Sequence, residues 1–332
     1  MHKLLPLLFF AASPAAAQQA GAPVIDMHAH AYTVDFVAGA SICPGSSGVP
    51  IPTVDPRDAF DPVELSRCAA PIAAPATDAA LMDESIAAMR RFNIRRAVTS
   101  GDPDSVAKWR AAAPDLIVPA LGFGASEPVS VETLTALADE GRLAVLGESF
   151  TQYRGIRADD PQWEAYWAFA EARDIPVGLH LGEGPPATAR FPGYESYRAS
   201  LTSPFQLEAV LHAHPKLRLY VMHYASPLVD EMIAMMYAHP NLYVDISANV
   251  GMAPRAQFYD HLKRMVDAGF GKRIMWGSDQ MQWPGIIGES VASIEEAPFL
   301  TAEQRRDIFY NNAARFLRLS PEEIARDHAP RE

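Results

Sequence analysis

The sequence predicts a closed (β/α)8 barrel of the TIM type. After residue 22, short runs rich in Val, Ile and Leu alternate with segments of helical periodicity, and eight such pairs follow one another. This alternation is typical of parallel strands joined by crossover helices, and eight repeats favour a closed barrel. The chain of 332 residues is long enough for one barrel of this kind. We therefore expect a single barrel domain over residues 23–320.

The predicted strands are short and apolar. They are expected at 24–28, 96–100, 116–121, 143–148, 176–181, 217–223, 242–247 and 274–279. Helices between them are expected, for example, at 78–92, 131–141, 161–173, 204–214, 229–239 and 256–268. Two helices end in nearly the same motif, "AHPKL" and "AHPNL", in which a His followed by Pro stops the helix. His214 and His239 are therefore assigned to the N-terminal face of the barrel, away from chemistry.

The segment of residues 32–77 separates the first strand from its helix and contains seven prolines. An irregular connection of this length is usually functional or disordered. Because it leaves the C-terminal end of the first strand, we expect an insertion over the barrel mouth; a loop that only decorates the rim is the alternative. Cys43 and Cys68 both lie in this segment, and the sequence is compatible with a disulfide or with two free thiols.

The chain opens with MHKLLPLLFFAASPAAAQQ, which has the features of a secretory signal peptide. A basic start precedes an apolar run that is too short to span a bilayer, and small residues precede Gln18. We expect residues 1–17 to be a signal peptide and the mature protein to be periplasmic or secreted, with no membrane association after cleavage. The net charge of −12, without clustered Lys or Arg, argues against a nucleic-acid partner.

Polar side chains close five of the eight predicted strands. They are His28 and His30 in "DMHAH", Glu148 in "GES", His180 in "LHLGEG", His223 in "MHYA" and Asp279 in "WGSD". Barrel enzymes build their active sites at this end of the strands. Each residue alone is compatible with a structural role, but a mouth full of unpaired polar groups is unstable unless something binds them. Imidazole with carboxylate is the ligand set of a catalytic divalent metal, and zinc is our first expectation.

On these motifs, together with the closing "IFYNNAARFLRL", the sequence resembles the amidohydrolase superfamily. It resembles more closely the amidohydrolase-2 branch, which includes aminocarboxymuconate semialdehyde decarboxylase, and the resemblance covers nearly the whole chain after the leader. The resemblance implies that His28, His30, His180 and Asp279 are metal ligands. For His223 it implies either a ligand of a second metal or a residue that steers water or substrate.

The fourth strand bears on the number of metals. Many members with two metals use a carboxylated lysine there, but the five lysines of this chain lie in the leader, in helices or at the wrong end of a strand. Glu148 occupies that place, where it could bridge two metals or orient one of the histidines. We expect one metal, with two as the alternative.

The expected chemistry is attack by a water molecule that the metal activates. Asp279 would take the proton of this water, and His223 would stabilise the developing oxyanion. Candidates for substrate binding follow the fourth, fifth and eighth strands: Tyr153, Arg154, Glu183, Arg190, Gln282 and Trp283. Arg154 is the better candidate for gripping a carboxylate, and Arg190 is expected to be solvated. Trp283 is expected either to pack against substrate or to cover the core.

Asp245 and Ser247 in "YVDISAN" share one face of the seventh predicted strand. Two interpretations are equally compatible with the sequence. The side chains hydrogen-bond the metal ligands or the substrate, or they only pack in a layer of the barrel.

The function expected from these observations is that of an exported metal-dependent hydrolase acting on a C–N, C–O or related bond of a small molecule. One alternative is a non-oxidative decarboxylase of an aromatic or unsaturated carboxylic acid at the same site. A second is a non-catalytic barrel that binds a metal or ligand. Export weakly favours hydrolysis, because the substrates of the decarboxylases are generally cytoplasmic. A monomer and a homodimer are both left open.

Overall fold

The computed structural model describes residues 21–37, 40–124 and 129–331. The predicted signal peptide, residues 1–17, lies outside the described residues. Within the described chain, no helix has both the length and the apolar character that crossing a membrane requires.

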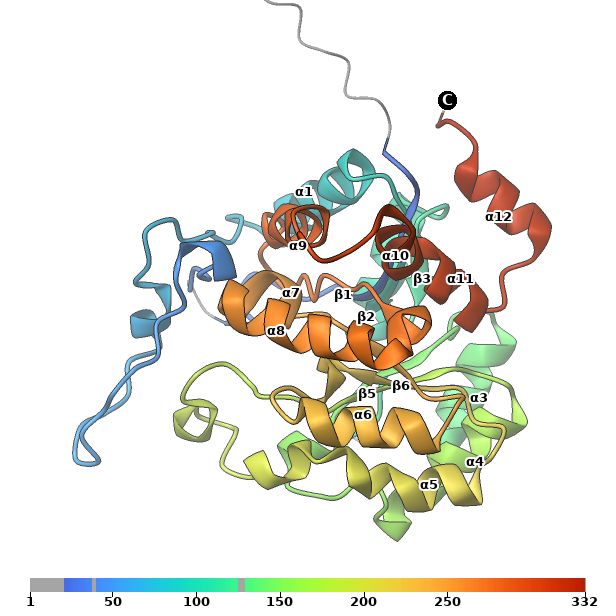
Figure 1. The fold of residues 1–332 in the computed structure, drawn as a ribbon, viewed down its shortest axis with the longest axis horizontal. Helices are drawn as coiled ribbons and strands as arrows, with labels where there is room; N and C mark the ends of the chain where they lie inside the picture. Colours follow the sequence, from blue (N-terminus) through green and yellow to red (C-terminus); the bar gives the residue numbers. More distant parts are fainter. Residues whose placement is uncertain (1–20, 38–39, 125–128, 332) are drawn as a thin grey trace, which may run out of the picture.

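Eight parallel strands form the predicted barrel (Figure 1). They are β1 (Val24–His30), β2 (Ile94–Ser100), β3 (Ile117–Pro119), β4 (Leu146–Ser149), β5 (Val177–His180), β6 (Leu219–Met222), β7 (Tyr243–Asp245) and β8 (Ile274–Met275). Strands β1 to β3 pair in chain order, and so do β4 to β8. Bridges between Ala120 and Val145 and between Ala29 and Gln280 join the two groups into a ring. Six strands are shorter than predicted, with β8 shorter by four residues at its C-terminal end and β4 by three at its N-terminal end, whereas β1 and β2 are longer than predicted.

Helices cover the outside of this ring. They are α1 (Asp78–Arg91), α2 (Pro103–Ala112), α3 (Val131–Asp139), α4 (Glu164–Ala172), α5 (Leu207–Ala213), α6 (Val229–Ala238), α7 (Asn249–Met252), α8 (Arg255–Met265), α9 (Ile286–Glu295), α10 (Ala302–Arg306), α11 (Asn312–Phe316) and α12 (Pro321–His328). Helix α1 shows why they form. Thr77 caps it by accepting the N–H of Ala80 at 3.2 Å, and Leu81, Ile86 and Met89 are buried at helical spacing.

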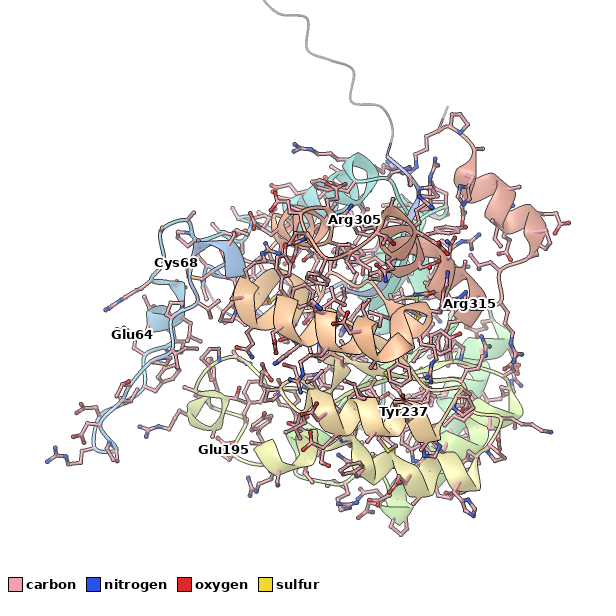
Figure 2. All side chains as sticks on the ribbon, viewed as in Figure 1. Glu64, Cys68, Glu195, Tyr237, Arg305 and Arg315 are labelled. Atoms are coloured by element: carbon pink, nitrogen blue, oxygen red, sulfur yellow. A yellow bond between two sulfur atoms is a disulfide. The ribbon has the colours of Figure 1, made fainter. Side chains whose placement is uncertain are left out.

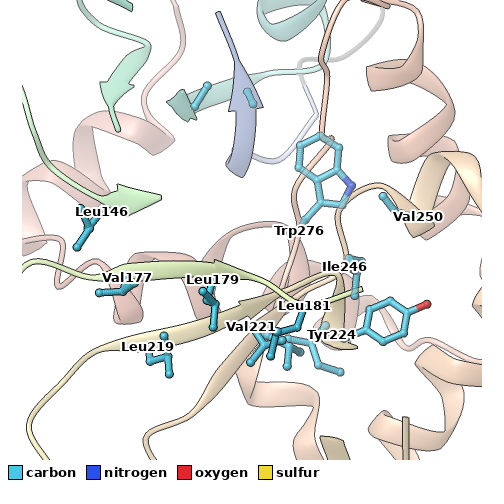
Figure 3. Packing of buried hydrophobic residues seen from close by; sticks show 14 of the residues in the cluster. Leu146, Val177, Leu179, Leu181, Leu219, Val221, Tyr224, Ile246, Val250 and Trp276 are labelled. Carbon is cyan, nitrogen blue, oxygen red and sulfur yellow. The ribbon is translucent and has the colours of Figure 1, made fainter. Parts of the chain in front are cut away.

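Strand β5 shows how the barrel orients its side chains. Val177 and Leu179 belong to the large apolar cluster that strands and helices share (Figure 3). Gly178 lies on the opposite face, where an added Cβ would come within 2.6 Å of the ring of Tyr220 in a second, inner cluster. Because side chains alternate along a strand, His180 shares the face of Gly178 and points into the barrel.

The C-terminal segment closes the end of the barrel opposite the mouth. Tyr310 and Phe316 pack in the inner cluster together with Met27 of β1. Helix α12 is tied to β2 by an ion pair between Arg96 Nε and Asp327 Oδ2 at 2.8 Å, and the hydroxyl of Tyr310 donates to the same carboxylate at 2.9 Å. This end of the barrel is therefore filled by apolar side chains and held by an ion pair.

His214 and His239 lie at the ends of α5 and α6, as predicted. His214 Nδ1 is 3.3 Å from Glu171 Oε2, and the carbonyl of His239 accepts a hydrogen bond from Arg273 at 2.8 Å. Both histidines thus make structural contacts at helix ends.

The chain between β1 and α1 is irregular, as expected for residues 32–77. Its described part contains two short 3-10 helices, Gly45–Ser47 and Pro62–Ser66. In Figure 1 it projects from the same side of the barrel as the loop that follows β5. The expectation that this segment covers the mouth stays a prediction.

A disulfide between Cys43 and Cys68 holds this segment together, with a Cα–Cα distance of 5.9 Å (Cys68 is labelled in Figure 2). Of the two states that the sequence left open, the structure has the disulfide. Next to it, Ile42 and Ile72 exchange two backbone hydrogen bonds of 2.8 and 2.9 Å. The two halves of the segment are therefore joined covalently and by backbone pairing.

Candidate metal centre

The six residues predicted from the strand ends meet inside the mouth of the barrel. They are His28, His30, Glu148, His180, His223 and Asp279, and each is at most 6% exposed. The backbone at His223 (φ 60°) and Asp279 (φ 51°) is left-handed, which is rare outside glycine and concentrates at functional sites. The barrel thus gathers six buried donors from five strands at one place.

The first donor group consists of His28, His30, Glu148 and Asp279. His28 Nε2 lies 3.1 Å from both His30 Nε2 and Glu148 Oε2. Asp279 Oδ1 lies 3.0 Å from His30 Nε2 and 3.7 Å from His28 Nε2. Metal–ligand bonds of about 2.0 to 2.2 Å place neighbouring donors of one ion roughly 3 to 3.5 Å apart. The four atoms therefore have the spacing of a metal site.

The second donor group consists of Glu148, His180 and His223. His180 Nδ1 is 2.6 Å from Glu148 Oε1 and 2.9 Å from His223 Nε2, which in turn is 3.2 Å from the same carboxylate oxygen. Glu148 thus directs Oε2 to the first group and Oε1 to the second. Three protein donors are compatible with an ion that keeps an open position for water or substrate.

The electrostatics of the cluster favour a bound cation. Although burial opposes ionisation, the charge of His28 and hydrogen bonds from His180 and His223 hold the pKa of Glu148 well below its ordinary value. Burial is likewise outweighed at Asp279, whose pKa is lowered by His28 and His30. Both carboxyl groups are therefore anionic at neutral pH. The donor set, two carboxylates with four imidazoles, matches the ligands that zinc and similar divalent metals accept.

The pKa values of two histidines shift in opposite directions. Burial lowers the pKa of His180, and the charge of His223 lowers it further, which leaves a neutral imidazole with a free lone pair. Burial would also lower the pKa of His28, but the charges of Glu148 and Asp279 outweigh it and raise the pKa well above its ordinary value. Without a metal, His28 therefore carries a proton that an incoming ion must displace.

Hydroxyl groups hold the outer nitrogens of three of the histidines. Ser100 Oγ is 2.9 Å from His30 Nδ1, and Ser247 Oγ is 2.8 Å from His28 Nδ1 and 3.0 Å from His223 Nδ1. Such partners fix the orientation and tautomer of metal-binding histidines. His180 differs, because within the described residues its Nε2 has no hydrogen-bond partner. Of the two interpretations of Ser247, contact with the predicted ligands is the correct one.

The sequence analysis did not single out three polar residues that form hydrogen bonds around His28 and His30. Besides Ser100, these are Asp26 and Ser278. Asp26 accepts hydrogen bonds from the N–H of His28 at 3.0 Å and from the hydroxyl of Ser278 at 2.6 Å, and burial raises its pKa to about 7. Ser100 closes β2 just as the predicted ligands close their strands, so its position was a usable signal.

Aromatic rings lie directly against the donor groups. Tyr153, a predicted substrate-binding residue, packs on His180 with ring centroids 4.8 Å apart. Tyr32, which the sequence reasoning did not single out, stacks on His30 at 4.3 Å and on Phe36 at 4.1 Å. Burial raises the pKa of Tyr32 and of Tyr153, so both phenols keep their protons and can donate hydrogen bonds.

The other substrate-binding candidates have different surroundings. Arg154 is exposed on a 3-10 helix after β4, and Glu183 accepts a hydrogen bond from the hydroxyl of Ser226 at 3.0 Å. Arg190 is exposed and donates to the carbonyl of Asp58 at 2.6 Å. Their contacts with a substrate stay predictions.

Gln282 and Trp283 bind the irregular segment after β1. The side-chain amide of Gln282 accepts from the N–H of Val37 at 2.7 Å and donates to its carbonyl at 3.0 Å. The indole of Trp283 is 4% exposed and donates to the carbonyl of Ala40 at 2.9 Å. Of the two roles expected for Trp283, these contacts favour covering over substrate packing.

Comparison with known proteins adds one family match. A family model described as Amidohydrolase matches residues 25–319. Among the curated proteins, none matches this chain.

Solved structures share the fold at low identity. An uncharacterised TIM-barrel protein from Bordetella bronchiseptica has 20% identity and a TM-score of 0.54, covering 71% of this chain and 81% of its own. A 2,6-dihydroxybenzoate decarboxylase from Rhizobium has 18% identity and a TM-score of 0.52, with coverages of 70% and 87%. A probable 2-pyrone-4,6-dicarboxylic acid hydrolase from Acinetobacter baumannii has 12% identity and a TM-score of 0.57, with coverages of 89% and 99%.

Proposed function

We propose, because this chain belongs to the amidohydrolase family, that it is a metal-dependent hydrolase with two divalent ions held by its two donor groups. The family membership establishes an enzyme of the amidohydrolase superfamily, and the choice of hydrolysis is our proposal. One observation carries it. Glu148 Oε2 is 3.1 Å from His28 Nε2, while Glu148 Oε1 is 2.6 Å from His180 Nδ1. A carboxylate placed in this way would offer one oxygen to each donor group if each group held an ion.

We expected one metal from the sequence, and the spacing of the donors leads us to propose two. His28, His30 and Asp279 would hold one ion and His180 and His223 the other, with Glu148 between them. This arrangement gives His223 the role of a ligand in place of a free group beside the oxyanion. Zn²⁺ is the first ion to test. The same nitrogen and oxygen donors also suit manganese, iron and cobalt.

Divalent ions at such a site supply water activation near neutral pH and polarisation of the scissile carbonyl. Asp279 is the residue that we propose as general base, because its carboxylate is anionic and has a second oxygen beyond the one that faces His30. Tyr153 and Tyr32 are proposed to contact a small-molecule substrate, since both rings border the donor groups.

Two ions favour hydrolysis over decarboxylation for a chemical reason. A hydrolase needs one ion for the water and gains from another at the carbonyl oxygen, whereas decarboxylation needs only a cation that holds the substrate. A barrel that merely stores a metal needs no general base beside it. The periplasmic or secreted location is proposed from the leader alone.

Elemental analysis of the purified mature protein, combined with a substrate panel of esters, amides, lactones and aromatic carboxylic acids, tests the proposal. We expect two ions per chain and release of an acid from the first three classes. Glu148→Ala should retain one ion or none, and His28→Ala should lose at least the first ion. Release of CO2 from an aromatic acid with no hydrolysis would identify the decarboxylase instead. A wild-type protein without metal would overturn the proposed chemistry altogether.

A further inference from the structure

A single hydroxyl group touches a predicted ligand from each donor group. Ser247 Oγ is 2.8 Å from His28 Nδ1, in the first group, and 3.0 Å from His223 Nδ1, in the second. Ser247 follows β7 and is completely buried. Asp245, the last residue of β7, lies beside it. Strand β7 thus contributes no ligand of its own to the two groups, yet its end contacts both.

The direction of the hydrogen bonds follows from counting protons. A serine hydroxyl donates one hydrogen bond and accepts two. The hydroxyl of Ser247 donates to Asp245 Oδ1 at 2.5 Å, an oxygen that also accepts two backbone N–H groups. The two imidazoles must then both donate to the serine oxygen from Nδ1. A metal-binding imidazole is neutral and has one N–H, so once the incoming ion has displaced the extra proton of His28, Nε2 of His28 and of His223 carries the lone pair.

These two Nε2 atoms are the ones that face Glu148. His28 Nε2 is 3.1 Å from Glu148 Oε2, and His223 Nε2 is 3.2 Å from Glu148 Oε1. The tautomer that Ser247 imposes is therefore the one that metal binding requires at both positions. His28, His223 and Asp245 also form a third set of close donors. In this set both Nδ1 atoms face Ser247 Oγ, and Asp245 Oδ2 lies 3.4 Å from His28 Nδ1 without a hydrogen-bond partner among the described residues.

Asp245 keeps the hydroxyl in this orientation. Its Oδ1 also accepts the backbone N–H of His223 at 2.9 Å and of Ser247 at 3.0 Å, and the residue is completely buried. Two backbone N–H groups therefore hold Oδ1 of Asp245 in place. Without it, the serine proton could turn towards an imidazole and favour the wrong tautomer.

Ser100 provides the comparison within the same chain. Its hydroxyl is 2.9 Å from His30 Nδ1 and supports a ligand of the first group alone. Ser100 is also buried, at 6% exposure. The two serines therefore differ in the number of donor groups that they touch and resemble each other in burial and chemistry.

We infer that Ser247 is a positioning residue shared by both metal positions: its hydroxyl, oriented by Asp245, sets the tautomer and ring orientation of one ligand of each ion. The inference rests on the proposed function, because it requires two ions. Its consequence is specific. Removing the Ser247 hydroxyl weakens the binding of both ions, whereas removing the Ser100 hydroxyl weakens the binding of one. Substitutions of this kind typically lower metal affinity by about 10-fold to 100-fold.

The test compares wild type, Ser247→Ala and Ser100→Ala as full mature proteins. Each is stripped with a chelator, checked for folding by circular dichroism, and titrated with Zn²⁺ against a competing chromophoric chelator to obtain both stepwise dissociation constants. We expect both constants to rise about tenfold or more in Ser247→Ala and only one to rise in Ser100→Ala. The carbonyl of Ser247, 3.2 Å from His223 Nδ1, remains in the variant, so binding is weakened and not abolished.

A second measurement needs no variant to fold. Long-range proton–nitrogen NMR spectra of the histidine-labelled, Zn²⁺-loaded wild type should show His28 and His223 protonated at Nδ1. If the wild type binds two ions, two results would overturn the shared role of Ser247 and leave the proposed function standing. Both dissociation constants of Ser247→Ala could stay within twofold of wild type, or only one of them could change. Nε2 protonation of either histidine would overturn it as well. One ion or none in the wild type would overturn the two-ion proposal and this inference together.

Discussion

We propose two tasks for the single carboxylate of Asp279, metal ligand and general base. Its Oδ1 faces His30 Nε2 at 3.0 Å, and the charges of neighbouring histidines keep its pKa below the ordinary value despite burial. Asn has the same shape and one carbonyl oxygen, but it cannot take up a proton at neutral pH. The residue therefore allows ligand and base roles to be separated by one substitution.

We predict that Asp279→Asn lowers kcat at least about 100-fold, the lower end of general-base contributions. Metal content, measured by elemental analysis on the same preparation, should remain close to that of the wild type. Turnover retained in the metal-loaded variant would contradict the base role. Loss of metal in parallel with activity would contradict the expected separation of the two roles by this substitution.

At the scale of elements, the turn after β3 approaches β4 very closely. A Cβ added to Gly122 would lie 1.6 Å from the carbonyl oxygen of Glu148 and 2.3 Å from its carbonyl carbon. Both atoms belong to the backbone, so no side-chain rotation relieves the clash. The position of the proposed bridging residue thus depends on a glycine in a neighbouring loop.

We predict that Gly122→Ala displaces β4 and destabilises the protein by about 1 to 3 kcal/mol or more, as overpacking does. It should also reduce the number of bound ions, because Glu148 moves with the backbone. Gly271→Ala is the matched control, since an added Cβ there meets nothing within 4 Å. Chemical denaturation and elemental analysis of both variants provide the measurement. Equal stability and metal content of the two variants would contradict this account.

At the scale of the whole molecule, we predict that metal binding and folding are linked. Each ion that binds only the folded barrel stabilises it by about 4 kcal/mol when its free concentration is a thousandfold above the dissociation constant. Removing the metal with a chelator should therefore lower Tm, and adding Zn²⁺ back should restore it. Calorimetric scans before and after chelation check this. An unchanged Tm would mean that the barrel mouth does not hold a tightly bound ion.

Metal binding should also release protons. Because the pKa of His28 is raised well above its ordinary value in the metal-free protein, His28 is protonated at neutral pH, and the ion must displace that proton. Metal affinity is therefore expected to fall as pH falls. Isothermal titration with Zn²⁺ in buffers of different ionisation enthalpy, analysed after allowance for metal–buffer binding, measures the released protons. Binding heats that do not vary with the buffer would contradict the prediction.

The order of the elements and the residues that meet at the mouth could be predicted from the sequence alone. The alternation of apolar runs with helical stretches defines parallel strands, and parallel strands end on one side, so polar residues closing them, such as His28 and Asp279, had to gather there. Strand boundaries differ from the prediction, because strands such as β8 (Ile274–Met275) end where backbone pairing with the neighbouring strand stops and not where the apolar run stops.

The division of these residues into two donor groups could not be predicted and became visible in the folded protein. That the two oxygens of Glu148 face different histidines, that Ser247 joins His28 to His223, and that Cys43 pairs with Cys68 all depend on separations of a few ångströms. Ser247 and His28 are 219 residues apart along the chain. Local sequence patterns carry no information about contacts at that separation, because closure of the barrel sets them.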